Sequence, residues 1–280
     1  MITPLLTLIV PVYNGDAYVA GNVRTIVRTL ETLGAPFEVL VVCDGSTDRT
    51  AAEVEAIGDP RIRVLDYALN QGKGHAICFG VPYARGRLVG WLDADLDIEP
   101  RAIVDAVRRF EHAEIDAVIG SKRHRDSQVD YPLRRRIMSW LFQLLVRSLV
   151  QVNVRDTQVG AKVFRREMLD VVVPLLLIKR YAFDLELLAV GVEFGFDRIE
   201  EMPVRLEYRF TGTGVNSQAV QRMFIDTLAI AYRIHLRHWY VRQFSAHQRE
   251  RTYIEKALDT SESISPSRSR TPFETLIGHP

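Results

Sequence analysis

The sequence predicts an α/β protein with a mostly parallel β-sheet and helices on both faces. Short apolar runs rich in β-branched residues alternate, through the first 120 residues, with segments whose apolar residues recur at helical spacing. Turn-forming, polar sequences follow several of these runs, where strands would end. Such alternation is typical of parallel sheets, whose ligands bind beyond the carboxyl ends of the strands. We therefore expect a site at that edge.

Each element of the first half has a local signal. Gly34 ends the first helix, Pro100 suits the first turn of the fourth, and Ser46 or Thr47 is expected to cap the second. The sequence Asn70-Gln71-Gly72-Lys73-Gly74 opens the third helix. Strands are expected at residues 5–12, 37–43, 61–66, 88–93 and 117–119, and helices at 17–33, up to about 57, from about 73, and at 100–112.

An acidic stretch at the end of the fourth strand is the centre of the predicted site. Asp93, Asp95 and Asp97 alternate, so they would share one side if the extended path continued. Three carboxylates this close repel one another unless a cation or hydrogen-bond donors compensate. Mg²⁺ and Mn²⁺ prefer such oxygen ligands and often share them with substrate phosphates. A solvated acidic turn explains the spacing equally well.

Two other loops have both a functional and a structural interpretation. Asp44 follows the second strand and could accept hydrogen bonds from a base or ribose, or simply form a turn with Gly45. Lys73 could meet a phosphate at a helix N-terminus, or be an exposed loop lysine. The glycine fingerprints of dinucleotide-binding folds and P-loops are missing, which disfavours both classes.

Four motifs occur in an order that resembles a known family. They are Ile9-Val10-Pro11-Val12-Tyr13-Asn14, Asp44-Gly45-Ser46-Thr47-Asp48, Asn70-Gln71-Gly72-Lys73-Gly74 and Asp93-Ala94-Asp95. Together they are similar to the family-two glycosyltransferases of GT-A (Rossmann-like) fold. The resemblance implies a nucleotide-sugar donor. It also implies that Pro11, Tyr13 and Asp44 hold the nucleoside, that Lys73 lies near it, and that Asp93 and Asp95 serve ribose and metal.

The second half begins with a basic loop beside an apolar helix. Lys and Arg cluster between residues 122 and 136, and residues 137–152 carry apolar side chains at helical spacing. This helix could lie in a membrane interface with arginines at headgroup level, or be a core helix with the loop as a solvated face. A basic loop beside an apolar helix is what a lipid-phosphate acceptor would need.

Over residues 5–240 the sequence resembles the polyprenyl-phosphate sugar synthases, especially the dolichyl-phosphate glucosyltransferases. The segments at 156–164 and 180–188 add to this resemblance. It implies that Asp97 is a third metal contact. It further implies that Arg135 and Ser139 bind the acceptor phosphate, with Lys122 or Arg123 nearby. Arg209 would reach the donor diphosphate, although the segment 212–216 lacks the family's Ser-Lys.

Three segments are expected: a glycosyltransferase domain at 1–217, an amphipathic helix at 218–255 and a disordered tail at 256–280. The domain would comprise a nucleotide-sugar half (1–119) and an acceptor half (120–217). The two cysteines lie in apolar sequence, and no run reaches the ~18 apolar residues of a membrane span. Because Met1 leads straight into a strand pattern without a leader, we expect a cytoplasmic protein, peripheral at the cytosolic membrane face.

The expected activity is a metal-dependent, inverting transfer of a hexose from a UDP- or GDP-sugar to a polyprenyl phosphate. Asp93, Asp95, Arg135 and Arg209 would be its catalytic residues and Mg²⁺ or Mn²⁺ its cofactor. A membrane-spanning partner could hold the chain at the bilayer, and no nucleic acid is expected. Two alternatives remain: the same fold with a soluble, protein or polysaccharide acceptor, and a catalytically silent nucleotide-sugar binder. A nucleotidyltransferase is disfavoured by the lack of a Gly-rich loop after the first strand.

Overall fold

The computed structural model describes residues 3–127, 146, 149–150, 152, 154–157, 159–178, 182–205 and 217–246, with side chains in the last range from residue 221. The chain divides into two compact units, Met1–Tyr240 and Val241–Pro280. The first unit holds the whole sheet and is the one described below. The predicted boundaries at 119/120 and 217/218 stay predictions, and the expected tail at 256–280 lies outside the described residues.

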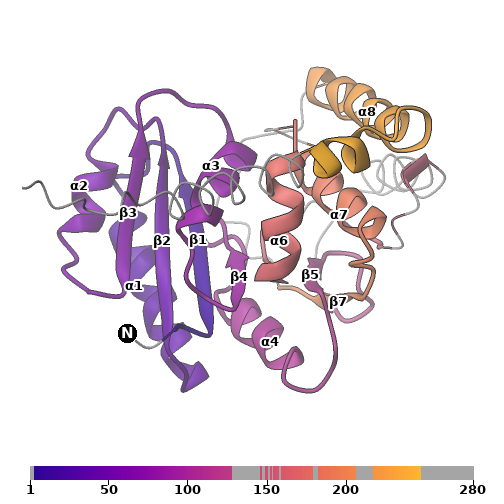
Figure 1. The fold of residues 1–280 in the computed structure, drawn as a ribbon. Coiled ribbons are helices and arrows are strands. Elements are labelled where there is room, and N and C mark those ends of the chain that lie inside the picture. The colour runs from indigo at the N-terminus through magenta and orange to yellow at the C-terminus, as the bar shows by residue number, and fades with distance from the viewer. Residues whose placement is uncertain are drawn as a thin grey trace, which may run out of the picture. The chain divides into compact units, whose positions relative to one another are not determined.

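Seven strands form one sheet in the described part of the chain, in the order β3-β2-β1-β4-β6-β5-β7 (Figure 1). The strand β6 runs antiparallel to its neighbours β4 and β5, and the other pairs are parallel. The prediction of a mostly parallel sheet is thus confirmed. The strands are β1 (Leu6–Val12), β2 (Phe37–Asp44), β3 (Ile62–Tyr67), β4 (Leu88–Trp91), β5 (Ala117–Ser121), β6 (Lys162–Arg165) and β7 (Ile199–Pro203).

Helices cover both faces of the sheet (Figure 1). The helices α1, α2 and α4 share one hydrophobic core with the sheet, whereas α3 packs on the opposite face. The helices are α1 (Val19–Leu30), α2 (Thr50–Glu55), α3 (Lys73–Gly80), α4 (Arg101–Arg109), α6 (Arg166–Val172), α7 (Phe183–Glu193) and α8 (Ser217–Ala231). Short 3₁₀ turns follow at Glu31–Leu33, Val81–Tyr83 and Val173–Leu175.

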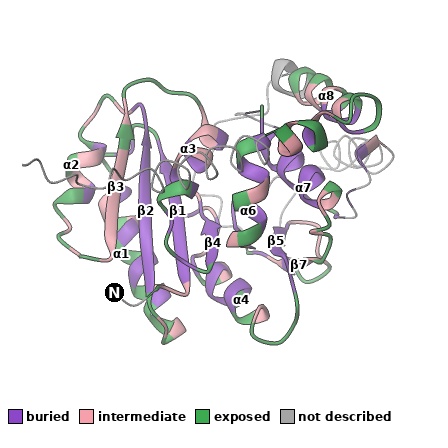
Figure 2. Ribbon diagram, in the orientation of Figure 1, coloured by how far each residue is buried: buried purple, intermediate pink, exposed green. Residues whose placement is uncertain are grey.

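The alternation of side chains in the central strands explains the two faces. Every residue of β1 and β2 is buried, as a strand covered on both sides must be (Figure 2). Leu8 and Val10 belong to the core with α1, whereas a Cβ on Gly80 of α3 would lie 3.2 Å from Ile9 on the other face. Pro11 is tolerated in this central strand because pairing with β4 ends at Ile9↔Trp91, so its missing N–H breaks no ladder there.

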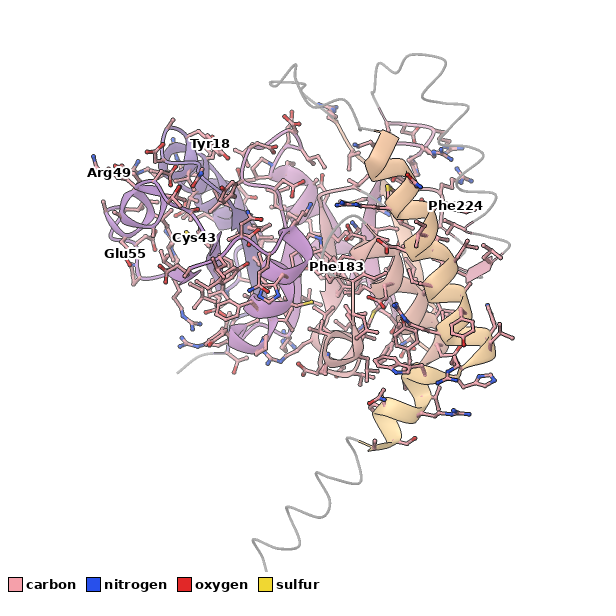
Figure 3. The ribbon with its side chains drawn as sticks, turned by 90° about the horizontal axis from the view of Figure 1, so that it is seen from above. Tyr18, Cys43, Arg49, Glu55, Phe183 and Phe224 are labelled. Carbon is pink, nitrogen blue, oxygen red and sulfur yellow. The ribbon has the colours of Figure 1, made fainter. Side chains whose placement is uncertain are left out.

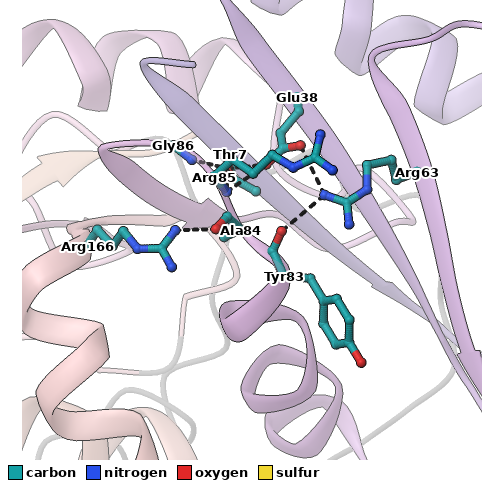
Figure 4. Close-up of polar contacts among 8 residues, drawn as sticks. All are labelled: Thr7, Glu38, Arg63, Tyr83, Ala84, Arg85, Gly86 and Arg166. Atoms are coloured by element: carbon teal, nitrogen blue, oxygen red, sulfur yellow. Dashed lines mark hydrogen bonds and ion pairs between the residues drawn. The ribbon is translucent and has the colours of Figure 1, made fainter. Parts of the chain in front are cut away.

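A buried carboxylate holds the amino edge of the sheet, opposite the predicted site. Glu38 accepts hydrogen bonds from the Thr7 hydroxyl and the Arg85 amide, both at 2.8 Å, and pairs with Arg63 at 3.3 Å (Figure 4). Thr7 Oγ1 in turn accepts from the Gly86 amide at 2.8 Å. These bonds tie β1, β2 and β3 to the chain entering β4. Next to them, Arg166 of α6 donates to the Ala84 carbonyl.

The acidic stretch departs from the predicted geometry. The strand β4 ends at Trp91 rather than Asp93, a turn follows at residues 94–95, and Leu96 has a positive φ of 57°. The extended path expected to place three carboxylates on one side therefore does not continue. The side chain of Asn22 donates to the Ala94 carbonyl at 2.8 Å, which holds this turn against α1.

Two other local predictions were wrong or incomplete. The helix α2 is not capped by Ser46 or Thr47: Arg49 precedes it, and the Asp48 carboxylate accepts the Thr50 amide instead, at 3.0 Å. The strand β7 was not anticipated, because its sequence Ile-Glu-Glu-Met-Pro combines two acids and a proline in a short run.

The helix α8 is interrupted near its end. A π-helical turn spans Tyr232–Leu236, and His238, with a φ of 44°, breaks the helix before it resumes at residue 239. None of the helices in the described residues combines the length and apolar character needed to cross a membrane.

Candidate donor site

Loops at the carboxyl ends of β1 and β2 interlock through Asn14. Its backbone amide donates to the Ser46 hydroxyl at 3.1 Å, and its side-chain oxygen accepts the Thr47 amide at 2.8 Å. Asn14 adopts a positive φ of 47°, which asparagine tolerates better than most residues. Tyr13 is half-exposed beside this junction, whereas Pro11 is buried within β1. Of the two, Tyr13 alone offers a surface on which a planar ring could stack.

Asp44 organises the loop that precedes α3. Its Oδ1 accepts hydrogen bonds from the Tyr67 hydroxyl at 2.8 Å and the Gln71 amide at 2.7 Å, and its Oδ2 accepts from the Gly72 amide at 2.8 Å. An ionised carboxylate offers about four acceptor positions, so about one remains for a ligand. Burial, followed by the hydrogen bond to Asp44 and its charge, raises the pKa of the Tyr67 phenol.

Two glycines make this arrangement feasible. Gly72 has a φ of 96° and Gly45 a φ of 66°, both in the region that L side chains rarely adopt. A Cβ on Gly45 would lie 2.2 Å from the Asn70 amide nitrogen, so the loops after β2 and β3 contact each other backbone to backbone.

Lys73 brings the α3 loop to the acidic turn. It is the first residue of α3, and its ammonium group pairs with Asp93 Oδ1. Both side chains are 36% exposed, so the pair borders solvent. Burial alone would lower the pKa of Lys73, but Asp93, Asp184 and Asp95 raise it above its ordinary value. Lys73 is therefore a cation held at the solvent border beside the acidic turn.

Asp95 and Asp97 form the rest of the acidic turn. Burial and the neighbouring carboxylates of Asp93 and Asp97 raise the pKa of Asp95, and the Asp97 amide donates to Asp95 Oδ1 at 3.1 Å. The Oδ1 atom of Asp97 is buried and has no hydrogen-bond partner within the described residues. An acceptor of this kind, next to mutually repelling carboxylates, fits a divalent cation.

The protein by itself does not complete a metal site, however. In the described part of the chain, no three His, Cys, Asp or Glu side chains converge as a ligand set. This geometry suits Mg²⁺ or Mn²⁺ only in the manner usual for Mg²⁺, with one or two carboxylates and the remaining ligands from water and substrate phosphates. Asp95 and Asp97 are the better placed, because Lys73 already occupies one oxygen of Asp93.

Sequence reasoning missed a second ion pair behind Lys73. Lys162 of β6 is completely buried, and its ammonium group lies 2.8 Å from Asp184 Oδ1 on the first turn of α7. It also donates to the Val159 carbonyl. The signal available in the sequence was a lysine inside the apolar run 159–164.

The segment leading into β6 packs directly on the acidic turn. A Cβ built on Gly160 would lie 2.0 Å from Asp93 Oδ2, a distance that no side chain could accept. Asp93 is therefore enclosed by Lys73 on one side and the Gly160 backbone on the other.

The predicted acceptor residues are only partly described. Lys122 and Arg123 form the turn directly after β5, and the Lys122 amide donates to Asp156 Oδ2 at 3.2 Å. The backbone of Lys122 therefore lies next to Asp156. Arg135, Ser139 and Arg209 lie outside the described residues, as does most of the predicted helix at 137–152.

A buried glutamate connects α7 to the end of α8. Glu186 Oε2 accepts the amides of Leu177 and Ile178 at 3.0 and 2.7 Å, and Oε1 accepts from Arg233 at 3.2 Å and the Tyr240 hydroxyl at 2.6 Å. Four bonds satisfy this fully buried carboxylate. Burial, followed by the charge of Glu186 and the hydrogen bond to it, raises the pKa of Tyr240, whereas Arg233 opposes this shift.

The loops described above bring together a half-exposed tyrosine, a carboxylate with a remaining acceptor position, a lysine at the solvent border and three acidic residues. They all lie at the carboxyl edge of β1, β2 and β4, where ligands of parallel sheets bind. The Glycosyl transferase family 2 model matches residues 7–173, which include all of these residues and more than half of the chain. The chain belongs to glycosyltransferase family 2.

The chain is similar to several curated glycosyltransferases. It is 32% identical to glycosyltransferase AglD of Haloferax volcanii over 72% of this chain and 33% of that protein. It is 30% identical to the dolichyl-phosphate beta-glucosyltransferase of Dictyostelium discoideum over 65% of this chain and 61% of that enzyme. The matched region thus spans about a third of the first relative and about three fifths of the second.

Solved structures confirm the fold. The glucosyl-3-phosphoglycerate synthase of Mycobacterium tuberculosis, crystallised with Mn²⁺, UDP and glucosyl-3-phosphoglycerate, has a TM-score of 0.61 at 20% sequence identity, covering 81% of this chain and 80% of that one. The GT-A type of fold that the motifs predicted is therefore shown.

Proposed function

We propose that this enzyme transfers a hexose from a UDP- or GDP-sugar to a polyprenyl phosphate, with inversion at the anomeric carbon. The observation that supports the donor half is the convergence of Tyr13, Asp44, Lys73 and the acidic turn at one edge of the sheet. The names of the relatives support the acceptor half, since they include dolichyl-phosphate beta-glucosyltransferases and a dodecaprenyl-phosphate galacturonate synthase. The structural relative's complexes with UDP and Mn²⁺ make that pair the first to test.

Each donor-site residue has a role in this proposal. Tyr13 stacks on the base, and the remaining acceptor position of Asp44 binds the base or ribose. Lys73 neutralises diphosphate charge from the helix N-terminus. Asp95 and Asp97 hold the divalent cation, with Asp93 completing the set or binding ribose. When bound, that cation stabilises the negative charge that builds on the departing diphosphate.

The reaction needs no general base from the protein. A phosphate monoester is largely dianionic at pH 7, since its second pKa is about 6. One of its oxygens attacks the anomeric carbon as the carbon–oxygen bond to the nucleoside diphosphate breaks, so the product is an inverted glycosyl phosphate lipid. Catalysis is then positioning and charge stabilisation. Lys122, Arg123, Arg135 and Ser139 would orient the acceptor phosphate, and Arg209 the donor diphosphate.

The outer face of α8 and its π-helical turn supports contact with a lipid surface. Its large apolar side chains are 43–72% exposed, and they recur at helical spacing; they are Phe224, Ile225, Leu228, Tyr232 and Leu236. Figure 3 marks Phe224 on this helix. Exposed Arg222 and Arg237 accompany them. A wide apolar stripe with arginines beside it is typical of helices that lie in a membrane interface and attract anionic headgroups.

A donor and acceptor panel tests this proposal. The purified enzyme is given radiolabelled UDP-glucose, UDP-galactose or GDP-mannose with Mn²⁺ or Mg²⁺, with and without a short polyprenyl phosphate. We expect a labelled, organic-extractable product only when both the metal and the lipid phosphate are present. Transfer to a soluble or protein acceptor without lipid would favour the alternative acceptor class. Donor binding without turnover or hydrolysis would favour a catalytically silent binder.

Liposome co-sedimentation tests the location. We propose a peripheral enzyme at the cytosolic membrane face, with or without a membrane-spanning partner. The wild type should sediment with vesicles containing anionic lipid, and Leu228→Asp should release it while leaving donor hydrolysis unchanged. Tyr83→Asp, which changes an equally exposed apolar side chain outside this helix, is the matched control. Equal sedimentation of Leu228→Asp and wild type would contradict a role for this face.

A further inference from the structure

Two lysines and two aspartates form adjacent ion pairs beside the donor site. Lys73 pairs with Asp93 at the solvent border, and Lys162 pairs with Asp184 behind them. The side chains of the first pair are 36% exposed, whereas Lys162 is completely buried and Asp184 is 11% exposed. Only the outer pair, Lys73 with Asp93, can contact a ligand directly. The inner pair, Lys162 with Asp184, can influence a ligand only through another group.

Lys162 makes two contacts that reach the outer pair. Its ammonium group holds Asp184 of α7 and also donates to the Val159 carbonyl. The second bond closes the turn that contains Gly160, whose backbone packs on the Asp93 carboxylate. Lys162 also lies opposite Trp91 in the sheet, with its ammonium group 6.0 Å from the Trp91 ring centroid. Figure 3 marks Phe183, the residue before Asp184, on α7.

The two pairs also interact electrostatically. Asp184, together with Asp93, raises the pKa of Lys73 against the effect of burial. Burial lowers the pKa of Lys162, and the nearby charge of Lys73 lowers it further, while Asp184 opposes both. Lys73 therefore has Asp184 within electrostatic reach, in addition to Asp93 and Asp95 on the acidic turn. A buried Asp184 carboxylate without a cationic partner would lower the stability of the fold, and it would attract the nearest cation.

We propose that Lys162 is a positioning residue of the donor site. Its ion pair with Asp184 neutralises that carboxylate, so Lys73 stays paired with Asp93. Its hydrogen bond to the Val159 carbonyl keeps the Gly160 backbone packed against the Asp93 carboxylate. Without Lys162, Lys73 turns inward to Asp184, and both the phosphate-binding cation and the acidic turn lose their orientation. The proposal rests on the proposed function only for its activity measurement, because the pairing itself is independent of the donor.

Acylation of Lys73, followed by mass spectrometry, tests the pairing without any donor. Lys162→Met should slow the acylation of Lys73 about 10-fold, since the amine moves from a position that is 36% exposed to one that is nearly buried. The double variant Lys162→Met/Asp184→Asn should restore the wild-type rate, because the competing charge is gone. Arg198→Met is the matched control. It also removes the cationic partner of a buried carboxylate, that of Asp116, but this pair lies at the start of β5 and β7. It should leave the Lys73 rate unchanged.

The activity measurement separates positioning from mere folding. At a temperature well below the unfolding midpoint, kcat/KM for the donor should fall about 10- to 100-fold in Lys162→Met, the usual cost of removing a group that orients a ligand-binding residue. It should recover in part in the double variant and stay at the wild-type value in Arg198→Met.

Two results would overturn the proposal. One is a wild-type Lys73 acylation rate in folded Lys162→Met; the other is a slow rate that the double variant fails to restore. If Lys162→Met does not fold, Lys162→Gln takes its place, because it keeps a donor for the Val159 carbonyl. A wild-type protein that uses no nucleotide sugar would refute the proposed function, and the labelling comparison would still decide the role of Lys162.

Discussion

Gly160 and Asp93 are packed so closely that a Cβ on the glycine would lie 2.0 Å from Asp93 Oδ2. The acidic turn after β4 is thus shaped by a segment almost seventy residues later in the chain. In this position the Asp93 carboxylate, paired with Lys73, occupies the space that a side chain at residue 160 would need.

Gly160→Ala should disable the donor site with little effect on folding. The added methyl group must displace either the Asp93 carboxylate or the turn, and either shift breaks the pair with Lys73. We expect kcat/KM for the donor to fall at least about 10-fold, in line with the loss of an orienting group. Gly21→Ala, where a Cβ meets nothing within 4 Å, is the control. Equal activity of the two variants would show that the contact has no catalytic consequence.

Asp95→Asn should abolish metal-dependent turnover of the donor. The substitution keeps the size of the side chain but removes the charge that would hold the cation beside the diphosphate. Isothermal titration with Mn²⁺ and UDP should show loss of metal-enhanced UDP binding, while metal-free UDP binding persists. Undiminished metal-dependent turnover by Asp95→Asn would contradict the assignment of Asp95 as a metal ligand.

Arg135→Ala should weaken binding of the acceptor while leaving binding of the donor unchanged. The resemblance to polyprenyl-phosphate sugar synthases places this arginine at the acceptor phosphate. The KM for the polyprenyl phosphate should rise about 10- to 100-fold, because a charge-assisted bond to phosphate contributes about 1.5–3 kcal/mol. The affinity for the nucleotide should stay within a factor of two. Loss of donor binding alone would show that Arg135 belongs to the donor half.

Glu38→Gln should lower the free energy of unfolding without changing the affinity for the donor. Glu38 is buried at the amino edge and accepts from Thr7 and Arg85 while pairing with Arg63. A neutral amide weakens the bonds to the carboxylate and removes the charge that Arg63 needs, so we expect a loss of about 1–3 kcal/mol. Urea unfolding measures this loss. A variant as stable as wild type would show that the network is dispensable.

Cys43 should resist alkylation in the folded enzyme. Burial, followed by the charges of Asp66, Asp48 and Glu55, raises the pKa of its thiol to about 12. At pH 8 only about one thiol in ten thousand is then ionised, and iodoacetamide reacts with the thiolate. Modification should reach Cys43 only after unfolding, whereas half-buried Cys78 is the internal comparison.

The same shift predicts a pH dependence of stability. Between about pH 9 and 12 the unfolded chain releases the Cys43 proton while the folded chain retains it, so this contribution to stability is lost as the pH rises. Cys43→Ala should flatten the decline in stability over this range. An identical decline in both proteins would assign it to other groups.

Local sequence was sufficient to predict most of the fold. The apolar runs of β1, β2, β3 and β5, the helical spacing of α1 and the left-handed Gly34 that ends its last turn all lie within a few residues of their predicted places. Short-range patterns determine these elements because burial on both faces leaves a continuous apolar strand. The motif loops at the carboxyl edge followed from the same alternation.

Contacts between distant segments decided the rest. No pattern in the sequence shows that β4 ends at Trp91 and turns, that Ser46 binds the Asn14 amide rather than capping α2, or that Lys162 is buried against Asp184. In each case the decisive partner lies far along the chain, and its hydrogen bond or charge outweighs the weak local preference. The sequence by itself determined the α/β sheet and the motif loops that follow its strands. Only the tertiary structure decided how the lysines and aspartates at this edge of the sheet are paired. A buried charge needs a partner of opposite charge, and the fold determines which one lies within reach.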